Sequence, residues 1–315
     1  MKTKKIFLIL IFSLLFVCGS YFGHRYYANL KEVKRQQALI EQGRLAWQSL
    51  REKLTNEIDQ FKGETGIVIK DLRNNWEISY DKDKIFPSAS LAKIPIMSVC
   101  FLAADQGRIN LDRNIALKSA DKLTGSGVLK DMPAGTTFSV ERLIGLMIYD
   151  SDNTAANMVT NLLGIDFLNN AFNGFGLKST SLSRRIADYQ SRDKGIENYT
   201  TAQDMALLLE KIYQRNLGNK YVSDQCISML KLTRINDRIP KYLPVDITIA
   251  HKTGLENGVC HDAGIVFTCK GDFIIVVLTK HGNANSIPSK EFIAKIALHT
   301  YVYFEQLQEG GERTE

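Results

Sequence analysis

Three short motifs of this sequence combine hydroxyl and amine side chains in a pattern that can support acyl transfer. In chain order they are Ser90-Leu91-Ala92-Lys93, Ser151-Asp152-Asn153 and Lys252-Thr253-Gly254. A serine becomes a strong nucleophile when a neighbouring base takes its proton, and a lysine whose pKa is lowered by burial can be that base. The motifs therefore indicate a serine enzyme that forms a covalent acyl intermediate.

The first motif is informative through its context, because a Ser-x-x-Lys spacing is common. This chain contains four such sequences, which begin at Ser90, Ser119, Ser191 and Ser228. Ser90 follows Phe86-Pro87 and opens an apolar stretch, residues 90–105, which predicts a helix. Residues three apart share one helix face, so Ser90 and Lys93 can meet, and the apolar neighbours of Lys93 would lower its pKa. Taken alone, the motif is equally explained by a capping serine and a solvated lysine.

The other two motifs also have ordinary structural explanations when each is taken alone. Ser151-Asp152-Asn153 fits a turn between two helices, and Lys252-Thr253-Gly254 fits a strand end followed by a turn glycine. Each tripeptide is rare enough that chance does not readily supply it. All three occur in order and in fitting contexts, which favours the catalytic interpretation.

Together the motifs resemble those of the penicillin-recognising serine enzymes, specifically their class A β-lactamase-like branch. The resemblance covers about residues 40–308 and includes Phe86-Pro87, the stretch Ser151–Asn157, and Asp262-Ala263-Gly264-Ile265. It implies a small-molecule substrate, either a β-lactam or a D-alanyl-D-alanine peptide, and no cofactor. The histidines show no close metal-ligand spacing, so no metal is expected.

The resemblance implies catalytic roles for four residues. Ser90 would attack the substrate carbonyl and form the acyl-enzyme, and Lys93 would take part in activating Ser90. Ser151 would relay a proton to the leaving nitrogen. Lys252 would orient Ser151 and attract the substrate carboxylate.

Four further residues would bind the substrate. Asn153 would hydrogen-bond the lysine of the first motif and the substrate amide, and Thr253 would contact the substrate carboxylate. Gly254 and Leu255 continue the substrate-binding strand. The backbone N–H groups of Ser90 and Leu255 would form the oxyanion hole.

The sequence departs from the family at the residue that should hydrolyse the acyl-enzyme. The family uses a glutamate that activates water, and Ile186 stands in its place here. Asp188 is the nearest carboxylate and is the predicted replacement, and Gln190 falls where the family has a water-holding asparagine. Glu197 lies further along and is more typical of a capping or ion-pair role.

A second departure concerns the substrate carboxylate. The family often has an arginine on the strand after the Lys-Thr-Gly motif, and Cys260 stands near that position. His261 occupies a position where the family often has asparagine. His251 precedes Lys252 and is expected to be structural.

Three functions therefore stay open. The first is a β-lactamase-type serine hydrolase, which the family branch favours and which would take part in β-lactam antibiotic catabolism. The second is a membrane-anchored D-Ala-D-Ala peptidase, a penicillin-binding protein with slow deacylation. The third is a non-catalytic β-lactam sensor that stays acylated. Ile186 fits the second and third better than the first.

The elements that position these motifs form a recognisable pattern. Strand-like stretches are residues 65–72, 76–80, 245–250, 264–269 and 273–279, and a closing helix is expected over 287–308. Ser139, Asp166 and Thr201 look like helix N-caps. An α/β (α+β) fold follows, with an antiparallel sheet made from both chain ends, flanking helices and an inserted all-helical subdomain over about 90–224.

The N-terminus predicts contact with a membrane. Lysines lead into an uncharged, largely apolar run over residues 6–23, which is typical of a signal peptide or a membrane anchor. Cleavage after Ser20, lipoprotein processing at Cys18 and an uncleaved anchor are the alternatives. We expect an anchor or signal over 1–27, a stalk over 28–45 and a hydrolase domain over 46–310. That domain should be extracytoplasmic, either membrane-anchored or secreted.

Charge excludes a nucleic-acid partner. The net charge of the 315 residues is +6, but residues 1–36 contain seven basic residues and one acidic residue. The remaining chain therefore holds 33 basic and 33 acidic residues and is neutral. A neutral body lacks the basic surface that nucleic acids require. The five cysteines are odd in number and argue against a disulfide framework, and we expect a monomer.

Overall fold

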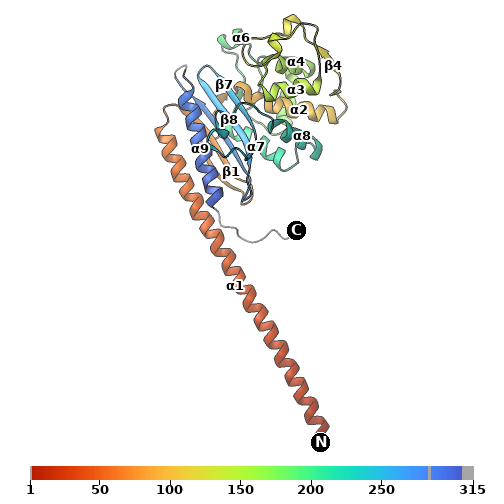
Figure 1. The fold of residues 1–315 in the computed structure, drawn as a ribbon, viewed down its shortest axis with the longest axis vertical. Coiled ribbons are helices and arrows are strands. Elements are labelled where there is room, and N and C mark those ends of the chain that lie inside the picture. Colours follow the sequence, from red (N-terminus) through yellow and green to blue (C-terminus); the bar gives the residue numbers. More distant parts are fainter. Residues whose placement is uncertain (1, 283–284, 307–315) are drawn as a thin grey trace. The chain divides into compact units, whose positions relative to one another are not determined.

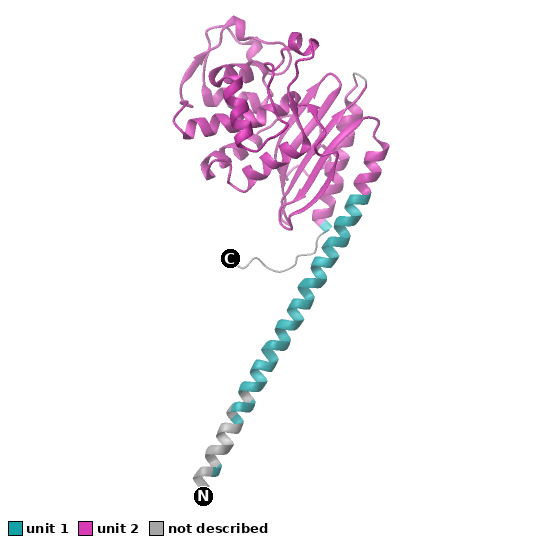
Figure 2. Ribbon diagram, turned by 180° about the vertical axis from the view of Figure 1, so that it is seen from behind, with its two compact units in different colours: residues 1–52, 306–315 teal, residues 53–305 magenta. Residues whose placement is uncertain are grey.

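The computed structural model describes residues 2–282 and 285–306 (Figure 1). The chain divides into two compact units, residues 1–52 with 306–315, and residues 53–305 (Figure 2). The motifs all belong to the second unit.

Helix α1 (Lys2–Gln60) supplies most of the first unit. Residues 28–60 contain no proline and one glycine, which suits a long helix. In the part of the chain that the structure describes, no helix is long and apolar enough to cross a membrane. The side chains at 6–12, 14 and 17, which make up much of the predicted membrane segment, lie outside the described residues. The membrane anchor therefore stays a prediction.

The second unit is built on a five-stranded antiparallel sheet with the order β2-β1-β9-β8-β7. Its strands are β1 (Glu64–Asp71), β2 (Trp76–Tyr80), β7 (Thr248–Glu256), β8 (Val259–Phe267) and β9 (Phe273–Lys280). Strand β1 pairs with β9, so the beginning and the end of the domain meet in the middle of the sheet. The predicted sheet made from both chain ends is confirmed.

Helices cover both faces of the sheet, as the burial of β9 shows. Ile274, Val276 and Leu278 of β9 belong to the core shared with the helical region, in which α7 (Ala202–Tyr213) packs on the sheet. Side chains alternate along a strand, so Phe273 points to the opposite face. There it stacks on Phe304 of α9 (Ile287–Gln306), the helix along that face in Figure 1.

The inserted helical region surrounds α2 (Lys93–Asp105), which is buried along most of its length. The other helices are α3 (Val140–Tyr149), α4 (Asn153–Leu163), α5 (Ile165–Gly174), α6 (Tyr189–Asp193) and α8 (Lys220–Leu230). Two small two-stranded antiparallel sheets accompany it. They are β3 (Phe86–Pro87) with β6 (Tyr199–Thr200), and β4 (Asn114–Ala116) with β5 (Thr137–Ser139). Helix α2 packs against α3, α4, α5 and α8.

The predicted N-caps are correct in two of three cases. Ser139 accepts a hydrogen bond from the Arg142 N–H, and Thr201 accepts one from the Asp204 N–H. The prediction for Asp166 is wrong, because α5 already begins at Ile165 after Gly164, whose φ of +85° ends the preceding helix. Glycine reaches this backbone conformation without steric cost.

Two predicted boundaries near the motifs are also wrong. Residues 89–92 form a short 3₁₀ turn, η1 (Ala89–Ala92), and the α-helix begins only at Lys93. Strand β7 begins at Thr248 and continues through the Lys252-Thr253-Gly254 motif to Glu256, because β8 pairs with it over its whole length. The third motif therefore lies inside a strand rather than at its end.

The packing of α9 against the sheet yields a stability prediction. Phe304 is 1% exposed and its ring lies 4.7 Å from that of Phe273. Phe304→Ala should lower the free energy of unfolding in urea by about 3–5 kcal/mol, because it leaves a cavity between helix and sheet. Ile287→Ala, at an exposed position of the same helix, should change it by less than about 0.5 kcal/mol. Equal effects of the two substitutions would show that α9 does not pack as described.

Candidate active site

Three elements bring the motifs together. Ser90 lies on η1, Ser151 lies in the turn between α3 and α4, and Lys252 lies on β7. The turn η1 packs directly against β7. The fold thus joins residues that are separated by up to 162 positions in the sequence.

Ser90 sits on a strained turn that leaves it accessible. The preceding residue, Ala89, has a φ of +44°, a conformation that costs a non-glycine residue on the order of 1–3 kcal/mol. Ala89 and Leu91 are buried while Ser90 is half-buried. The turn therefore presents the hydroxyl of Ser90 at the N-terminal end of α2, where backbone N–H groups carry partial positive charge.

Lys93 is fully buried and is held by the second motif. Its Nζ donates to the carbonyl oxygen of Ser151 at 2.6 Å and to Oδ1 of Asn153 at 2.9 Å, and lies 3.2 Å from Oγ of Ser151. Ser151 has a φ of +54°, and this left-handed conformation places its carbonyl and its hydroxyl near the same amine. The strain at Ser151 thus serves the contact with Lys93.

The environment of Lys93 favours its neutral form. Burial lowers the pKa of Lys93 well below its usual value, and the positive charge of Lys252 lowers it further, while Asp152 and Glu256 oppose this. A neutral amine has two N–H groups and one lone pair. The two carbonyl-type oxygens of Ser151 and Asn153 can accept only, so they take both N–H groups. The lone pair is then left for a hydroxyl proton, which is what a general base requires.

Lys252 approaches Ser151 from the other side. Its Nζ donates to Oγ of Ser151 at 3.0 Å and to the carbonyl oxygen of Thr253 at 2.9 Å. Burial lowers the pKa of Lys252 to about 7, and Arg238 also lowers it, whereas Asp262 raises it. The hydroxyl of Ser151 therefore lies between two buried amines, and a proton can pass along this line.

Asp152 has a structural role within the second motif. Its carboxylate accepts hydrogen bonds from the N–H groups of Val128, Leu129 and Ala155 at 2.7–2.9 Å. Gly127 has a φ of +110°, and a Cβ there would lie 2.2 Å from the Asp152 carboxyl carbon. Asp152 thus caps α4 and fixes the loop before it.

Strand β7 lies at the edge of the sheet, beside the nucleophile. A Cβ on Gly254 would lie 3.4 Å from Cβ of Ala89, so glycine allows the strand to approach the Ser90 turn closely. Thr253 is buried and the side chain of Leu255 is 47% exposed. Since β7 pairs only with β8 in this sheet, the backbone groups along its other side are available to a ligand.

His261 connects the sheet to the segment before Ser90. The Thr279 N–H donates to Nδ1 of His261 at 3.1 Å, so Nε2 carries the proton and donates to the Pro87 carbonyl at 2.8 Å. Burial lowers the pKa of His261 to about 4, which keeps the ring neutral. His251, predicted to be structural, lies 3.0 Å from Oδ1 of Asp262 on the neighbouring strand.

The structure places an arginine beside Cys260, the residue that stands near the position of the family's arginine. Arg238 precedes the 3₁₀ turn η4 (Ile239–Tyr242), is 1% exposed, and its Nε lies 3.1 Å from Sγ of Cys260. Its Nη1 lies 3.1 Å from Asp237 but is too poorly aligned to form a hydrogen bond. Sequence reasoning missed Arg238, because it comes from another segment and no motif surrounds it.

The structure gives Asp188 a capping role. Its two carboxylate oxygens accept from the N–H and the hydroxyl of Ser191, at 3.0 and 2.7 Å, so that it caps α6. These hydrogen bonds lower the pKa of Asp188. Ile186 lies closer to the core, and the side-chain amide of Asn157 holds both its N–H and its carbonyl, at 3.0 and 2.8 Å.

Glu197 forms the ion pair that its sequence position suggested. Arg184 is 4% exposed and donates from Nη2 and Nε to Oε1 of Glu197 at 2.6 and 3.0 Å. The same Nη2 lies 3.1 Å from Glu256, at the end of β7. Sequence reasoning missed Arg184 and Glu256, because they lie 72 positions apart in the chain.

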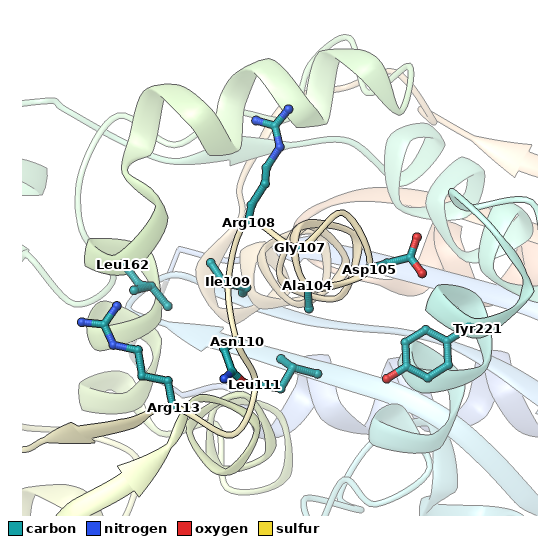
Figure 3. Close-up of a pocket in the computed structure, with 10 residues that line it drawn as sticks. All are labelled: Ala104, Asp105, Gly107, Arg108, Ile109, Asn110, Leu111, Arg113, Leu162 and Tyr221. Atoms are coloured by element: carbon teal, nitrogen blue, oxygen red, sulfur yellow. The ribbon is translucent and has the colours of Figure 1, made fainter.

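Two cavities lie outside the three motifs. One of about 360 Å³ is lined by residues 185–190 together with Asn157 and neighbouring side chains. The other, of about 710 Å³, lies at the C-terminal end of α2, and Arg108, Arg113 and Tyr221 are among its lining residues (Figure 3). Among the described residues, no group of three or more His, Cys, Asp or Glu side chains could hold a metal ion.

Comparisons with known proteins identify chains that are similar to this one in sequence and in fold. The sequence profile of the Beta-lactamase enzyme family matches residues 49–304. Beta-lactamase VEB-1 of Pseudomonas aeruginosa is 25% identical over 272 residues, which are 80% of this chain and 89% of VEB-1.

Two solved structures are also similar. A beta-lactamase from Sphaerobacter thermophilus aligns with a TM-score of 0.72 at 29% identity, over 79% of this chain and 93% of that one. PBP-A aligns with a TM-score of 0.76 at 27% identity, over 82% and 97% of the two chains. A variant of PBP-A has been solved as an acyl-enzyme complex with penicillin G.

The buried Lys252 predicts a specific pH dependence of stability. Its pKa is about 7 in the folded protein and is ordinarily 10.5, so between these values the unfolded chain binds a proton that the folded protein does not. Stability should therefore rise with pH in this window, by up to about 1.4 kcal/mol per pH unit. Lys252→Met should remove this contribution, while the rise that comes from Lys93 stays, because the pKa of Lys93 is lowered as well.

Urea unfolding of both proteins at pH 7, 8 and 9 measures the difference. A difference between wild type and Lys252→Met that stays constant over this range would contradict the lowered pKa of Lys252.

Proposed function

This chain belongs to the beta-lactamase enzyme family, and on that premise we propose that it is a serine hydrolase of the class A β-lactamase type. Its reaction is the opening of the β-lactam amide, which removes a β-lactam antibiotic. The observation that carries the proposal is the position of the Ser151 hydroxyl between two buried amines, 3.2 Å from Lys93 and 3.0 Å from Lys252. A merely structural turn has no need to bury two lysines around one hydroxyl.

Acylation follows from the protonation states of these groups. Neutral Lys93 accepts the proton of Ser90, whose Oγ attacks the carbonyl carbon of the substrate. The carbon–nitrogen bond breaks as the tetrahedral intermediate collapses. Ser151 gives its proton to the leaving nitrogen and regains one from the adjacent amine. The result is an ester between the substrate acyl group and Ser90.

Substrate binding uses the free side of β7 and the groups around it. The backbone N–H groups of Ser90 and Leu255 hold the developing oxyanion, and Asn153 binds the substrate amide. Lys252 and Thr253 attract the substrate carboxylate. The buried Arg238 adds positive charge behind this strand, in the region where the family's arginine is missing.

Ile186 favours one alternative, a D-Ala-D-Ala peptidase that acylates in the same way but deacylates slowly. An isoleucine side chain cannot activate water, and its backbone is held in place by Asn157. The similarity to PBP-A, a variant of which forms an acyl-enzyme with penicillin G, is consistent with this alternative. A sensor that stays acylated would share the same first step.

We also propose that residues 1–27 export or anchor the chain, so that a monomeric catalytic domain works outside the cytoplasm. The leading lysines and the apolar run support this proposal.

Acylation of Ser90 can be tested directly. The full chain is mixed with a chromogenic penicillin, and ring opening and intact protein mass are followed together. We expect a mass increase equal to one penicillin, located on the peptide that contains Ser90, with repeated turnover. Ser90→Ala should show neither the mass increase nor turnover above about one thousandth of the wild-type rate.

The outcomes separate the alternatives. A single burst with a persistent adduct, combined with release of D-alanine from a D-Ala-D-Ala peptide, would establish the peptidase. A persistent adduct without D-alanine release would establish the sensor. Wild-type protein that neither gains mass nor opens the β-lactam ring would rule out serine acylation altogether.

A further inference from the structure

The hydrolysis of the acyl-enzyme needs a base that takes a proton from water. The carboxylates that lie near Lys93 are the candidates for this base. Asp152 and Glu256 are the carboxylates whose negative charge raises the pKa of Lys93. Asp152 is a poor candidate for the base, because its carboxylate already accepts hydrogen bonds from three backbone N–H groups. Glu256 has no such partners among the described residues, apart from Arg184.

The strand register places Glu256 on the face of β7 that carries the site. Alternate residues of a strand share one face, so Lys252, Gly254 and Glu256 point the same way. Lys252 contacts Ser151 on this face, and Gly254 packs against Ala89, the residue before Ser90. Glu256 is the next residue of β7 on that face, two positions after Gly254.

The contacts of Glu256 hold it in place and leave it able to accept a proton. Both carboxylate oxygens of Glu256 lie near Nη2 of Arg184, at 3.1 and 3.4 Å. Arg184 forms shorter hydrogen bonds with Glu197, at 2.6 and 3.0 Å. One guanidinium thus serves two carboxylates, and the cluster carries a net negative charge. The side chain of Glu256 is 12% exposed, so it is mostly buried but still reaches solvent.

Charged groups around Glu256 support its basicity. Burial raises the pKa of Glu256 and the negative charge of Glu197 raises it further, whereas Arg184 and Arg192 oppose the shift. The negative charge of Glu256 in turn raises the pKa of the buried Lys93 amine, so the carboxylate and the amine influence each other's protonation. A carboxylate with a raised pKa is a better proton acceptor near neutral pH than an ordinary surface glutamate.

We propose that Glu256 is the general base that activates water for hydrolysis of the Ser90 acyl-enzyme, in place of the glutamate that Ile186 replaces. The inference rests on the proposed serine acylation. One proton of the water passes to the Glu256 carboxylate while the water oxygen bonds to the acyl carbon. The bond between that carbon and Oγ of Ser90 then breaks. The proton held by Glu256 returns, directly or through Lys93, to Oγ of Ser90, and the free acid leaves.

The test measures acylation and deacylation separately in the full chain. Wild type and Glu256→Gln are acylated with penicillin G, excess ligand is removed, and loss of the adduct is followed by intact mass. Glu256→Gln should deacylate about 100-fold to 1,000-fold more slowly and acylate within a few-fold of wild type. The wild-type deacylation rate should fall at low pH as Glu256 is protonated, and this fall should be absent in Glu256→Gln.

Glu197→Gln is the matched control, because it also removes one carboxylate from Arg184. It should slow deacylation much less and should keep the fall of the rate at low pH, shifted to lower pH because the charge that raises the pKa of Glu256 is gone. Equal slowing in both variants would show that Glu256 acts only by holding the loop, and would overturn the proposal. Glu256→Asp should restore part of the lost rate.

Further outcomes distinguish the inference from the function on which it rests. Normal acylation with unchanged deacylation in Glu256→Gln would overturn the role of Glu256 alone, as would a wild-type adduct that persists. If neither wild type nor the variants gain mass or open the β-lactam ring, serine acylation itself is rejected and the inference falls with it; ring opening without any adduct in Glu256→Gln would overturn the role of Glu256 alone. Unfolding in urea verifies that each variant is folded.

Discussion

The structure depends on the burial of two lysine side chains around one serine hydroxyl. Removing an ammonium group from water is costly, and a protein limits that cost by neutralising the amine and satisfying its hydrogen bonds. Lys93 donates hydrogen bonds to two oxygen atoms of the second motif. Lys252 donates to the hydroxyl of Ser151 and to the carbonyl oxygen of Thr253 in its own strand. The apolar helix α2, the left-handed conformation of Ser151 and the edge position of β7 all serve this arrangement.

This constraint also explains where the backbone is strained. Ala89 and Ser151 both have positive φ values although neither is a glycine. Ala89 precedes the proposed nucleophile, and Ser151 is the proposed proton relay. The surrounding contacts compensate for the strain: the close approach of Gly254 to Ala89 and the hydrogen bonds of Asp152 to the neighbouring loop. Strain at these two positions orients the reacting groups before any substrate arrives.

The two halves of the proposed reaction are served by different parts of the fold. The acylation groups come from the three motifs, which meet at η1, the α3–α4 turn and β7. The deacylation groups would come from the loop that carries Arg184 and Glu197 and from the end of β7. At the position of the family's glutamate the loop has Ile186, while Asp188 caps α6 and Glu197 pairs with Arg184, so we propose that the end of β7 supplies the base. A change at the end of β7 can therefore alter the lifetime of the acyl-enzyme and leave its formation intact.

The sequence by itself determined the motifs, the sheet made from both chain ends and the helix caps at Ser139 and Thr201, because these depend on local composition and periodicity. The cap predicted at Asp166 failed because the preceding Gly164 ends one helix and lets the next begin a residue early. Arg238 beside Cys260, and Arg184 between Glu197 and Glu256, were decided only by the tertiary structure. Burial and charge pairing between distant segments depend on how β7 and the loops pack. A local sequence pattern does not predict that packing.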